Sequence, residues 1–286
     1  MLSFLPTTVR GVLLLLLYVI NTIFWSMVLF LVALLKLVVP VTGWRKLCSR
    51  VMNGIGTIWI FFNNCNTRLI NKIHWDVSGT DNLVANRWYL VVANHQSWVD
   101  ILVMQKIFYR KIPFLKFFLK KELFWVPILG LAWWALDYPF LERSSSTLKD
   151  IEITKRACQK FMTLPVSIMN FVEGTRFTRE KHSEQGSPYS HLLKPKAGGI
   201  ALVLAAMGEQ LHSILDVTIA YPEGGKSFWA FLCGEIREVK VRVESLPIDK
   251  EVSGDYFQDR EFRKRFRNWL NKLWAEKDKT LAALLD

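Results

Sequence analysis

The fold is decided by the stretch WYLVVANHQSWVD, residues 88–100. Its apolar first half, Trp88 to Ala93, predicts a buried strand. His95 and Asp100 follow, and in one continuous helix five residues would turn the chain by about 500° and leave the two side chains roughly 140° apart. The pair can therefore meet only if the strand ends in a turn that carries His95 and a helix begins near Ser97. Serine is a good N-cap, and Asp100 would then stand at position N3.

This spacing is informative because of the chemistry of the two side chains. Histidine has a proton affinity suited to general-base work near neutral pH, and a carboxylate on its far nitrogen fixes the tautomer. The heptapeptide Asn94 to Asp100 alone leaves a second interpretation open, in which a capped helix begins beside an incidental histidine. A second motif is needed to decide between the two.

That second motif also follows an apolar run. The run Val166 to Asn170 predicts a strand, and Phe171-Val172-Glu173-Gly174-Thr175-Arg176 comes directly after it. Glycine lets the backbone approach a ligand closely, and the guanidinium fork of arginine suits a phosphate. The strand would therefore deliver Glu173, Gly174 and Arg176 together, as a phosphate-binding turn.

A third motif lies between these two in the chain. It consists of Lys120-Lys121-Glu122-Leu123, then Trp125-Val126-Pro127, and finally Leu141-Glu142-Arg143. In this order the three motifs resemble the glycerolipid acyltransferase family, which includes the 1-acyl-glycerol-3-phosphate acyltransferases. The resemblance covers roughly residues 70–225. The strings FVEGTRFT, EKH and WVPILGLAWWALD are most similar to an inner-membrane enterobacterial branch of that family.

The resemblance implies an O-acyltransferase. Such an enzyme transfers a fatty acyl group from a thioester donor, acyl-CoA or acyl carrier protein (acyl-ACP), to 1-acyl-sn-glycerol 3-phosphate and gives phosphatidic acid for phospholipid synthesis. No Gly-x-Ser-x-Gly elbow occurs in the sequence, which disfavours an acyl-serine intermediate. His95 would instead deprotonate the glycerol hydroxyl, which attacks the thioester directly, while Asp100 orients the imidazole. The acyl donor is then a co-substrate, and no other cofactor is implied.

The resemblance also implies which residues bind the acceptor: Glu173, Gly174, Thr175, Arg176, Lys120, Arg143 and Pro222. Two of the motifs that supply them depart from the family pattern. The family often has Ile-Asp-Arg where this chain has Leu141-Glu142-Arg143. It often ends a later strand with Val-Pro-Val, whereas here Pro222 stands alone after the predicted strand.

Two alternatives stay open at this point. A related acyltransferase could use another lysophospholipid with a larger head group, because the catalytic pair does not specify the acceptor. A non-catalytic membrane adaptor could keep the same fold. Such an adaptor should have lost His95 or Asp100, and both are present.

Composition and charge favour a membrane over a nucleic acid as partner. The chain has 286 residues, 51% of them hydrophobic, with 12 tryptophans and a formal net charge of +12. Such a charge suits either nucleic acid or an anionic membrane surface. No zinc-finger spacing or RNA-recognition signature occurs, whereas an apolar segment does. We therefore expect membrane lipids, a lysophosphatidate-type acceptor and acyl-CoA or acyl carrier protein as partners, and no nucleic acid.

The cysteines and the remaining histidines form no recognisable metal or disulfide pattern. They are scattered through the chain, as Cys48, Cys65, Cys158 and Cys233 and as His74, His182, His191 and His212. Dispersed residues of this kind predict a reducing compartment and no metal site.

The apolar segment near the N-terminus predicts a membrane anchor. No charged residue occurs from Gly11 to Leu35, and about 25 helical residues reach about 37 Å, enough for a hydrocarbon core of about 30 Å. A cleaved signal peptide would have an apolar core of only about 7–15 residues. The basic residues Lys36, Arg45, Lys46 and Arg50 follow the run, which predicts a bacterial inner-membrane protein with its catalytic domain on the cytoplasmic side. A hairpin that dips into one leaflet, with residues 47–66 as its second helix, is the alternative.

Strand and helix alternate through the rest of the chain. We expect strands at 73–77, 88–93, 166–170 and 217–221, and helices at 101–107, at 149–162 and from 198 onward. This alternation predicts an α/β fold of the glycerol-3-phosphate acyltransferase type, with a largely parallel sheet flanked by helices and a site at the carboxyl ends of the strands. We divide the chain into N-terminal membrane-anchoring helices, 1–70, and an acyltransferase catalytic domain, 71–286.

Three further segments carry expectations of their own. Residues 178–196 are polar and broken by Gly186, Pro188 and Pro195, which predicts a long surface loop. Residues 260–274 form an amphipathic helix that either packs on the domain or lies on an anionic membrane. The apolar stretch Trp125 to Trp134 is either core or the lining of a slot for an acyl chain.

Overall fold

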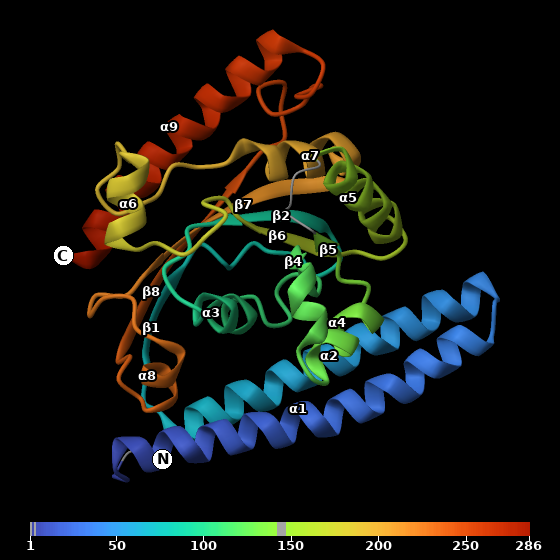
Figure 1. Ribbon diagram of the computed structural model, residues 1–286, viewed down its shortest axis with the longest axis vertical. Coiled ribbons are helices and arrows are strands. Elements are labelled where there is room, and N and C mark those ends of the chain that lie inside the picture. The colour runs from blue at the N-terminus through green and yellow to red at the C-terminus, as the bar shows by residue number, and fades with distance from the viewer. Residues whose placement is uncertain (1, 3, 142–146) are drawn as a thin grey trace.

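A six-stranded sheet in the order β1-β8-β7-β2-β6-β3 forms the centre of the protein (Figure 1). The computed structural model describes residue 2 and residues 4–141 and 147–286. Strands β7, β2, β6 and β3 are parallel to one another, whereas β8 is antiparallel to β7 and β1 is parallel to β8. The expected largely parallel sheet is therefore confirmed. Its strands are β1 (His74–Ser78), β2 (Trp88–Ala93), β3 (Leu115–Phe117), β6 (Ser167–Phe171), β7 (Leu211–Ala220) and β8 (Glu238–Leu246).

Helices cover both faces of this sheet, so the central strand β2 is apolar on both sides. Leu90, Val91 and Val92 are all fully buried, and alternate side chains enter different cores. Leu90 and Val92 pack with α5 (Thr147–Phe161), α7 (Ala197–Met207) and α9 (Arg260–Leu285). Val91 packs on the other side with α3 (Asp100–Ile107), α4 (Leu129–Ala135) and α8 (Phe228–Leu232). Figure 1 shows these two groups of helices above and below the sheet.

Two long helices, α1 (Thr7–Val38) and α2 (Thr42–Ile70), form a hairpin along the face of the domain that carries α3, α4 and α8 (Figure 1). The amide of Asn21 donates to the side-chain oxygen of Asn63 over 2.8 Å, and Leu14 and Leu29 belong to the core under the sheet. In the part of the chain that the structure describes, α1 is the one helix long and apolar enough to cross a membrane. The alternative with a second helix at 47–66 matches α2.

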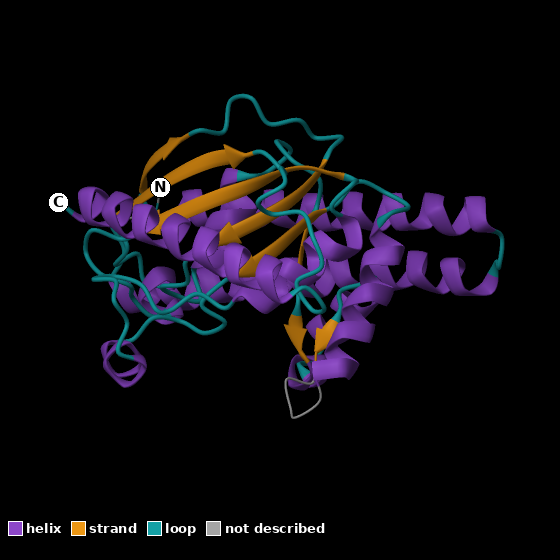
Figure 2. Ribbon diagram, turned by 90° about the horizontal axis from the view of Figure 1, so that it is seen from above, coloured by secondary structure: helices purple, strands orange, loops and turns teal. Residues whose placement is uncertain are grey.

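A small two-stranded sheet, β4 (Leu119–Lys120) with β5 (Phe140–Leu141), lies beside the main sheet (Figure 2). A short helix, η1 (Lys121–Trp125), and α4 connect its strands. The apolar stretch between them is not wholly core, because Trp125 is 80% exposed and Trp134 is 51% exposed. Its role as the lining of an acyl-chain slot stays a prediction. Helix α4, which carries Trp134, is in contact with α1.

Regular helix after β2 begins at Asp100, and the expected N-cap contacts of Ser97 precede it, because its hydroxyl accepts from the backbone N–H of Val99 over 3.2 Å. The Ser97 hydroxyl donates to the carbonyl of Lys226 over 2.7 Å, and the Asp100 carboxylate accepts from the backbone N–H of Ser97. The turn therefore continues through Val99 before regular helix starts.

The expected surface loop at 178–196 contains a helix, α6 (Arg179–Gln185). Thr178 caps it by accepting from the N–H of Lys181, and Gly186 ends it in the left-handed conformation. Strand β8 was not predicted at all, although Val239, Val241 and Val243 alternate with charged residues along it.

The C-terminal helix α9 packs on the domain, as one of the two interpretations expected. Its apolar face is buried through Phe262, Phe266, Leu270 and Trp274. The exposed face is left with the basic residues, so the helix has no free apolar face with which to lie on a membrane.

Candidate active site

The turn that carries His95 is fixed by the residue before it. The Asn94 side chain donates to the carbonyl of Ile219 over 2.9 Å and accepts from the Ile219 N–H over 2.8 Å. These two bonds continue the pairing of β2 with β7 by one residue through a side chain, and Asn94 is fully buried. His95 therefore leaves the sheet at a defined point, at the carboxyl end of β2.

The imidazole of His95 meets the carboxylate of Asp100 as the motif predicted. Nδ1 lies 2.8 Å from Oδ2 of Asp100, and the ring stacks on Phe171 with centroids 3.8 Å apart and planes 13° apart. Because the carboxylate accepts from Nδ1–H, the lone pair of Nε2 faces away from it. The His95 side chain is 13% exposed. The arrangement leaves one ring nitrogen ready to take a proton from a substrate.

Asp100 is completely buried, and four donors hold its carboxylate. Besides His95, Oδ2 accepts from the N–H of Gln96 over 2.7 Å and from that of Ser97 over 2.9 Å. Oδ1 accepts from the hydroxyl of Tyr221 over 2.6 Å, and burial together with this carboxylate raises the pKa of that phenol well above its ordinary value. A carboxylate with this many donors has little freedom to rotate.

Glu173 is buried as well, but its side chain accepts hydrogen bonds from backbone N–H groups and does not contact the imidazole of His95 through a hydrogen bond. Oε1 accepts from the N–H of His95 over 2.8 Å, and Oε2 accepts from the N–H of Leu193 over 2.9 Å. Burial raises the pKa of Glu173 to about 8, although both hydrogen bonds act in the opposite direction. This geometry favours a role in positioning His95 over the direct contact with the acceptor that the resemblance implied.

The turn after β6 places Arg176 beside the dyad. Gly174 has φ +70, a left-handed conformation that glycine adopts without strain, and the N–H of Phe177 donates to the carbonyl of His95 over 2.7 Å. The guanidinium of Arg176 lies 4.4 Å from the centroid of the Trp98 ring. Stacking orients the guanidinium plane and leaves its edge donors available to an anion.

Two lysines that the motifs did not single out lie at the same turn. Lys181 donates to the Thr175 hydroxyl over 2.9 Å and to the carbonyl of Arg176 over 3.2 Å. The side chain of Lys196 passes so close to Gly174 that a β-carbon there would lie 3.4 Å from its Nζ. Within the described residues, no carboxylate forms an ion pair with Arg176, Lys181 or Lys196. The turn is therefore a concentration of uncompensated positive charge.

The other expected acceptor-binding residues are placed less decisively. Pro222 follows Tyr221 directly after β7, so it stands at the same edge of the sheet as His95. Lys120 is exposed at the end of β4, and among the described residues no hydrogen bond or ion pair is found between it and the dyad. Arg143 lies outside the described residues.

Helix α9 braces the site from behind. The carboxylate of Asp278 accepts from the N–H groups of Ser190 and His191 over 2.7 and 2.8 Å, and the indole of Trp274 donates to the carbonyl of Leu193 over 3.0 Å. Leu193 in turn holds Glu173, as described above. Among the described residues, no three His, Cys, Asp or Glu side chains are grouped as metal ligands would be.

A family model described as Acyltransferase matches residues 74–222, which is more than half of the chain and includes both turns. The chain belongs to the Acyltransferase family. The match ends at Pro222, directly after the tyrosine that holds Asp100.

Individual relatives agree with this assignment. The chain is 26% identical to human 1-acyl-sn-glycerol-3-phosphate acyltransferase gamma over 66% of its own length and 51% of the relative's. It is 30% identical to Arabidopsis thaliana 1-acyl-sn-glycerol-3-phosphate acyltransferase 3 over 49% of its own length and 40% of the relative's. The chain thus spans about half the length of curated relatives that it matches.

The fold agrees with a solved structure of an acyltransferase. This is the 1-acyl-sn-glycerophosphate acyltransferase PlsC from Thermotoga maritima, with a TM-score of 0.56 and 18% sequence identity. The similarity covers 97% of this chain and 98% of that one, so it includes the helical hairpin as well as the sheet.

Proposed function

We propose that the protein is a 1-acyl-sn-glycerol-3-phosphate O-acyltransferase that makes phosphatidic acid for phospholipid synthesis. One observation carries the proposal: the partly exposed His95, paired with the buried Asp100 and with one ring nitrogen open, lies beside a turn of cations without ion-pair partners among the described residues. A general base next to an anion site is what an acceptor with both a hydroxyl and a phosphate requires. The identity of the transferred acyl group and of the glycerol phosphate acceptor is taken from the names of the relatives.

The reaction begins when Nε2 of His95 removes the proton of the acceptor hydroxyl. The oxygen forms a bond to the thioester carbonyl carbon, and collapse of the tetrahedral intermediate breaks the carbon–sulfur bond. The leaving thiolate takes the proton from the imidazolium, so the products are an ester and a free thiol and His95 is regenerated. Asp100 stabilises the imidazolium between these two proton transfers, as the carboxylate does in the serine-hydrolase triad.

The acceptor phosphate fits the cationic turn. Arg176 offers a planar fork of donors along the edge that stacking on Trp98 leaves free, and Lys181 and Lys196 add point charges to the same turn. The buried Glu173 keeps this turn and His95 in register without presenting its own charge to the phosphate.

The acyl donor has a basic groove next to the same turn. A cavity of about 720 Å³ lies between residues 188–198 and α9, and its described lining residues include Lys194, Lys196 and Arg267 but no carboxylate. Both acyl-CoA and acyl carrier protein carry the thioester on a phosphorylated arm, so this charge suits either donor. Lys196 would then stand between the donor and acceptor phosphates.

The hairpin suits attachment along one leaflet better than a full crossing. Helix α1 is about 48 Å long at 1.5 Å per residue, yet both ends rest on the same domain. Gly11 packs against Trp229 of α8 and against Cys233, which follows that helix, and Lys36 near the other end forms an ion pair with Asp137 over 2.8 Å. Many large apolar side chains of α1 face outward between these contacts. We propose that this face is immersed in the cytoplasmic leaflet of a bacterial inner membrane.

Product analysis tests the chemistry. Purified protein is offered lysophosphatidate, lysophosphatidylethanolamine or lysophosphatidylglycerol with acyl-CoA or acyl-ACP, and products are identified by mass spectrometry. We expect phosphatidic acid to dominate and His95→Ala to lower its rate by about 10²–10⁴. Equal turnover in His95→Ala, or no ester from any acceptor, would overturn the proposal. A dominant product from another lysolipid would reassign the acceptor.

Salt washing tests the attachment. Because the outward face of α1 is apolar, we expect high salt to leave the protein on membranes. Release by salt alone would contradict an immersed hairpin and would assign the attachment to surface charge.

A further inference from the structure

A cluster of amines lies at the opposite end of the sheet from His95. The hollow that it lines is bounded by Thr163 to Val166, which directly precede β6, whereas the cationic turn follows β6. Five strand residues separate the two by about 17 Å. The cluster therefore has no part in the proposed chemistry.

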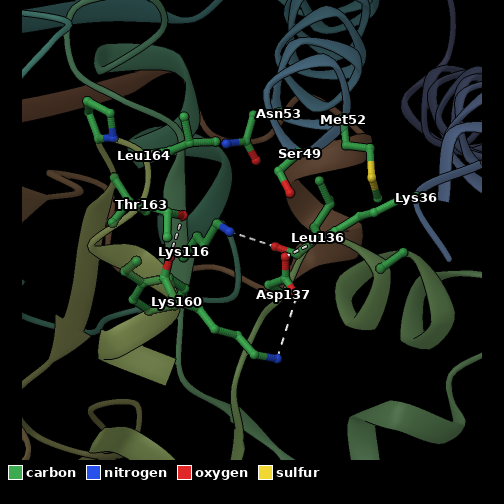
Figure 3. A pocket seen from close by; sticks show the side chains of 14 residues that line it. Lys36, Ser49, Met52, Asn53, Lys116, Leu136, Asp137, Lys160, Thr163 and Leu164 are labelled. Carbon is green, nitrogen blue, oxygen red and sulfur yellow. Dashed lines mark hydrogen bonds and ion pairs between the residues drawn. The ribbon is translucent and has the colours of Figure 1, made fainter. Parts of the chain in front are cut away.

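Figure 3 shows that three lysines from distant parts of the chain converge here. Lys36 from α1 lies 2.8 Å from Asp137, and Lys160 from α5 lies 3.8 Å from the other oxygen of the same carboxylate. Lys116 from β3 is buried and donates to the carbonyl of Leu136 over 2.7 Å, and burial lowers its pKa to about 8. Asp137 has the only carboxylate among the described residues that line the hollow and the cavity beside it, so three amines there face one negative charge.

Asp137 holds this position in an uncommon backbone conformation. Its φ is 60°, and it is one of three non-glycine residues with positive φ in the described part of the chain. Left-handed backbone is several-fold enriched in Asp and Asn but still uncommon. Strain of this kind gathers at sites of function.

A larger cavity of about 380 Å³ shares Lys36, Asp137 and Lys160 with the hollow, and its wall is amphipathic. One side has the charges of Lys36, Asp137, Arg156 and Lys160, although Glu152 pairs with Arg156. The other side is apolar and includes Leu37 and Trp134, which are 59% and 51% exposed. These two side chains continue the outward apolar face of α1.

We propose that this cavity is a second lipid site, separate from the catalytic one, and that it binds an anionic phospholipid of the membrane. The phosphate would lie between Lys36 and Lys160, and an acyl chain would follow Leu37 and Trp134 into the leaflet. An amphiphile matches both walls at once, which a free phosphate does not. Anionic lipid would also supply the negative charge that the lysines lack. The proposal rests on the leaflet attachment proposed above but not on the acyl transfer.

Two sets of substitutions at this site should change the affinity for anionic lipid in opposite directions. The double variant Lys36→Gln with Lys160→Gln removes both positive charges that would face the lipid phosphate, so the affinity for phosphatidylglycerol should fall about tenfold. Asp137→Asn removes the competing carboxylate and keeps a residue that tolerates positive φ, so affinity should rise several-fold. If the cluster only formed ion pairs that hold the fold together, both changes would disturb it in the same way, and lipid affinity would fall in both variants or in neither.

The experiment is native mass spectrometry of detergent-purified full-length protein titrated with phosphatidylglycerol or phosphatidylcholine. It is done in a His95→Ala background so that bound lipid cannot be product, and a failure of the acyl-transfer proposal leaves the result intact. The control is the double variant Lys272→Gln with Lys279→Gln on α9, which also removes two positive charges but at exposed positions away from the cavity. We expect the protein to bind phosphatidylglycerol more tightly than phosphatidylcholine. The affinity for phosphatidylglycerol should fall in the double lysine variant, rise in Asp137→Asn and stay unchanged in the α9 control.

Several results would overturn the proposal. These are equal affinity for the two lipids, a double variant that equals the α9 control, weaker binding in Asp137→Asn, and displacement of lipid by inorganic phosphate at equal concentration. If the double lysine variant does not fold, as judged by thermal unfolding, Asp137→Asn alone decides through the direction of its shift.

Discussion

The turns after β2 and after β6 leave neighbouring strands at one edge of the sheet and are built in opposite ways. In the first, the polar groups are paired: Asp100 has four donors, and the Asn94 amide is bonded on both sides. In the second, one buried carboxylate, Glu173, holds backbone while Arg176 and Lys196 point their charges outward. A paired, rigid turn suits proton transfer, which depends on exact geometry. An open cationic turn suits binding. Substitutions in the first turn should therefore lower kcat, and those in the second should raise KM for the acceptor.

The most severe test of this contrast after His95 itself is Asp100→Asn. The amide would favour the tautomer with a proton on Nε2, so His95 could no longer act as a base. We expect kcat to fall by about 10²–10⁴ with little change in KM. Steady-state kinetics with both substrates varied would measure this, with Asp81→Asn on the surface as control. A loss confined to KM would contradict the assignment of the first turn to chemistry.

Arg176→Lys tests the second turn. An ammonium keeps the charge but loses the bidentate fork and the stacking on Trp98. We expect about a tenfold rise in KM for the acceptor, with KM for the donor and kcat nearly unchanged. Arg179→Lys, at the exposed start of α6, is the matched control. An equal loss for both substrates would point to a structural arginine.

Tyr221→Phe should give a smaller effect on the first turn. The variant keeps the ring but removes the hydroxyl that donates to Oδ1 of Asp100, while three donors still hold Oδ2. A hydrogen bond to a charged group contributes about 1.5–3 kcal/mol, and part of this loss should appear as roughly a three- to tenfold lower kcat. Unchanged KM for both substrates would distinguish this from disruption of the whole edge. A kcat equal to wild type would show that the other three donors suffice.

Glu173→Gln should change turnover least, and its effect should depend on pH. Because burial raises the pKa of Glu173 to about 8, the folded state holds the carboxyl proton more tightly than the unfolded state does. Between about pH 4.5 and 8 the folded state binds more protons, so this group makes the free energy of unfolding fall as pH rises. Because glutamine does not titrate, the free energy of unfolding of the Gln variant should fall less than that of the wild type as pH rises from about 4.5 to 8. Urea unfolding at several pH values would measure it, and parallel curves for the two proteins would contradict the buried, proton-binding glutamate.

Sequence predicted the elements whose signal is local. The apolar runs before His95 and Glu173 became β2 and β6, and the spacing of His95 and Asp100 correctly required a break in the chain. The predicted capping contacts of Ser97 and Asp100 are present, because the Ser97 hydroxyl accepts from Val99 and the Asp100 carboxylate accepts from the N–H of Ser97. The bond from the same hydroxyl to the carbonyl of Lys226, 129 positions away, has no local signal.

The parts that could not be predicted depend on strand order. Tyr221 reaches Asp100 across 121 residues only because β7 pairs with β2, and no local pattern records that pairing. Lys196 is likewise brought to Gly174 by the return of the chain from α6 to α7. The alternating valines of β8, by contrast, were a readable signal.

The hairpin has a consequence for how the protein is made. Leu14 and Leu29 of α1 enter the same core as Phe231 and Val239, which the ribosome adds about two hundred residues later. During that interval at about 5–20 residues per second, the hairpin has no domain to cover its inner face. Early contact with the membrane or with a chaperone would protect those side chains while the rest of the chain is completed. Deleting α1 would, for the same reason, leave a permanent opening in the core under the sheet rather than release an intact water-soluble enzyme.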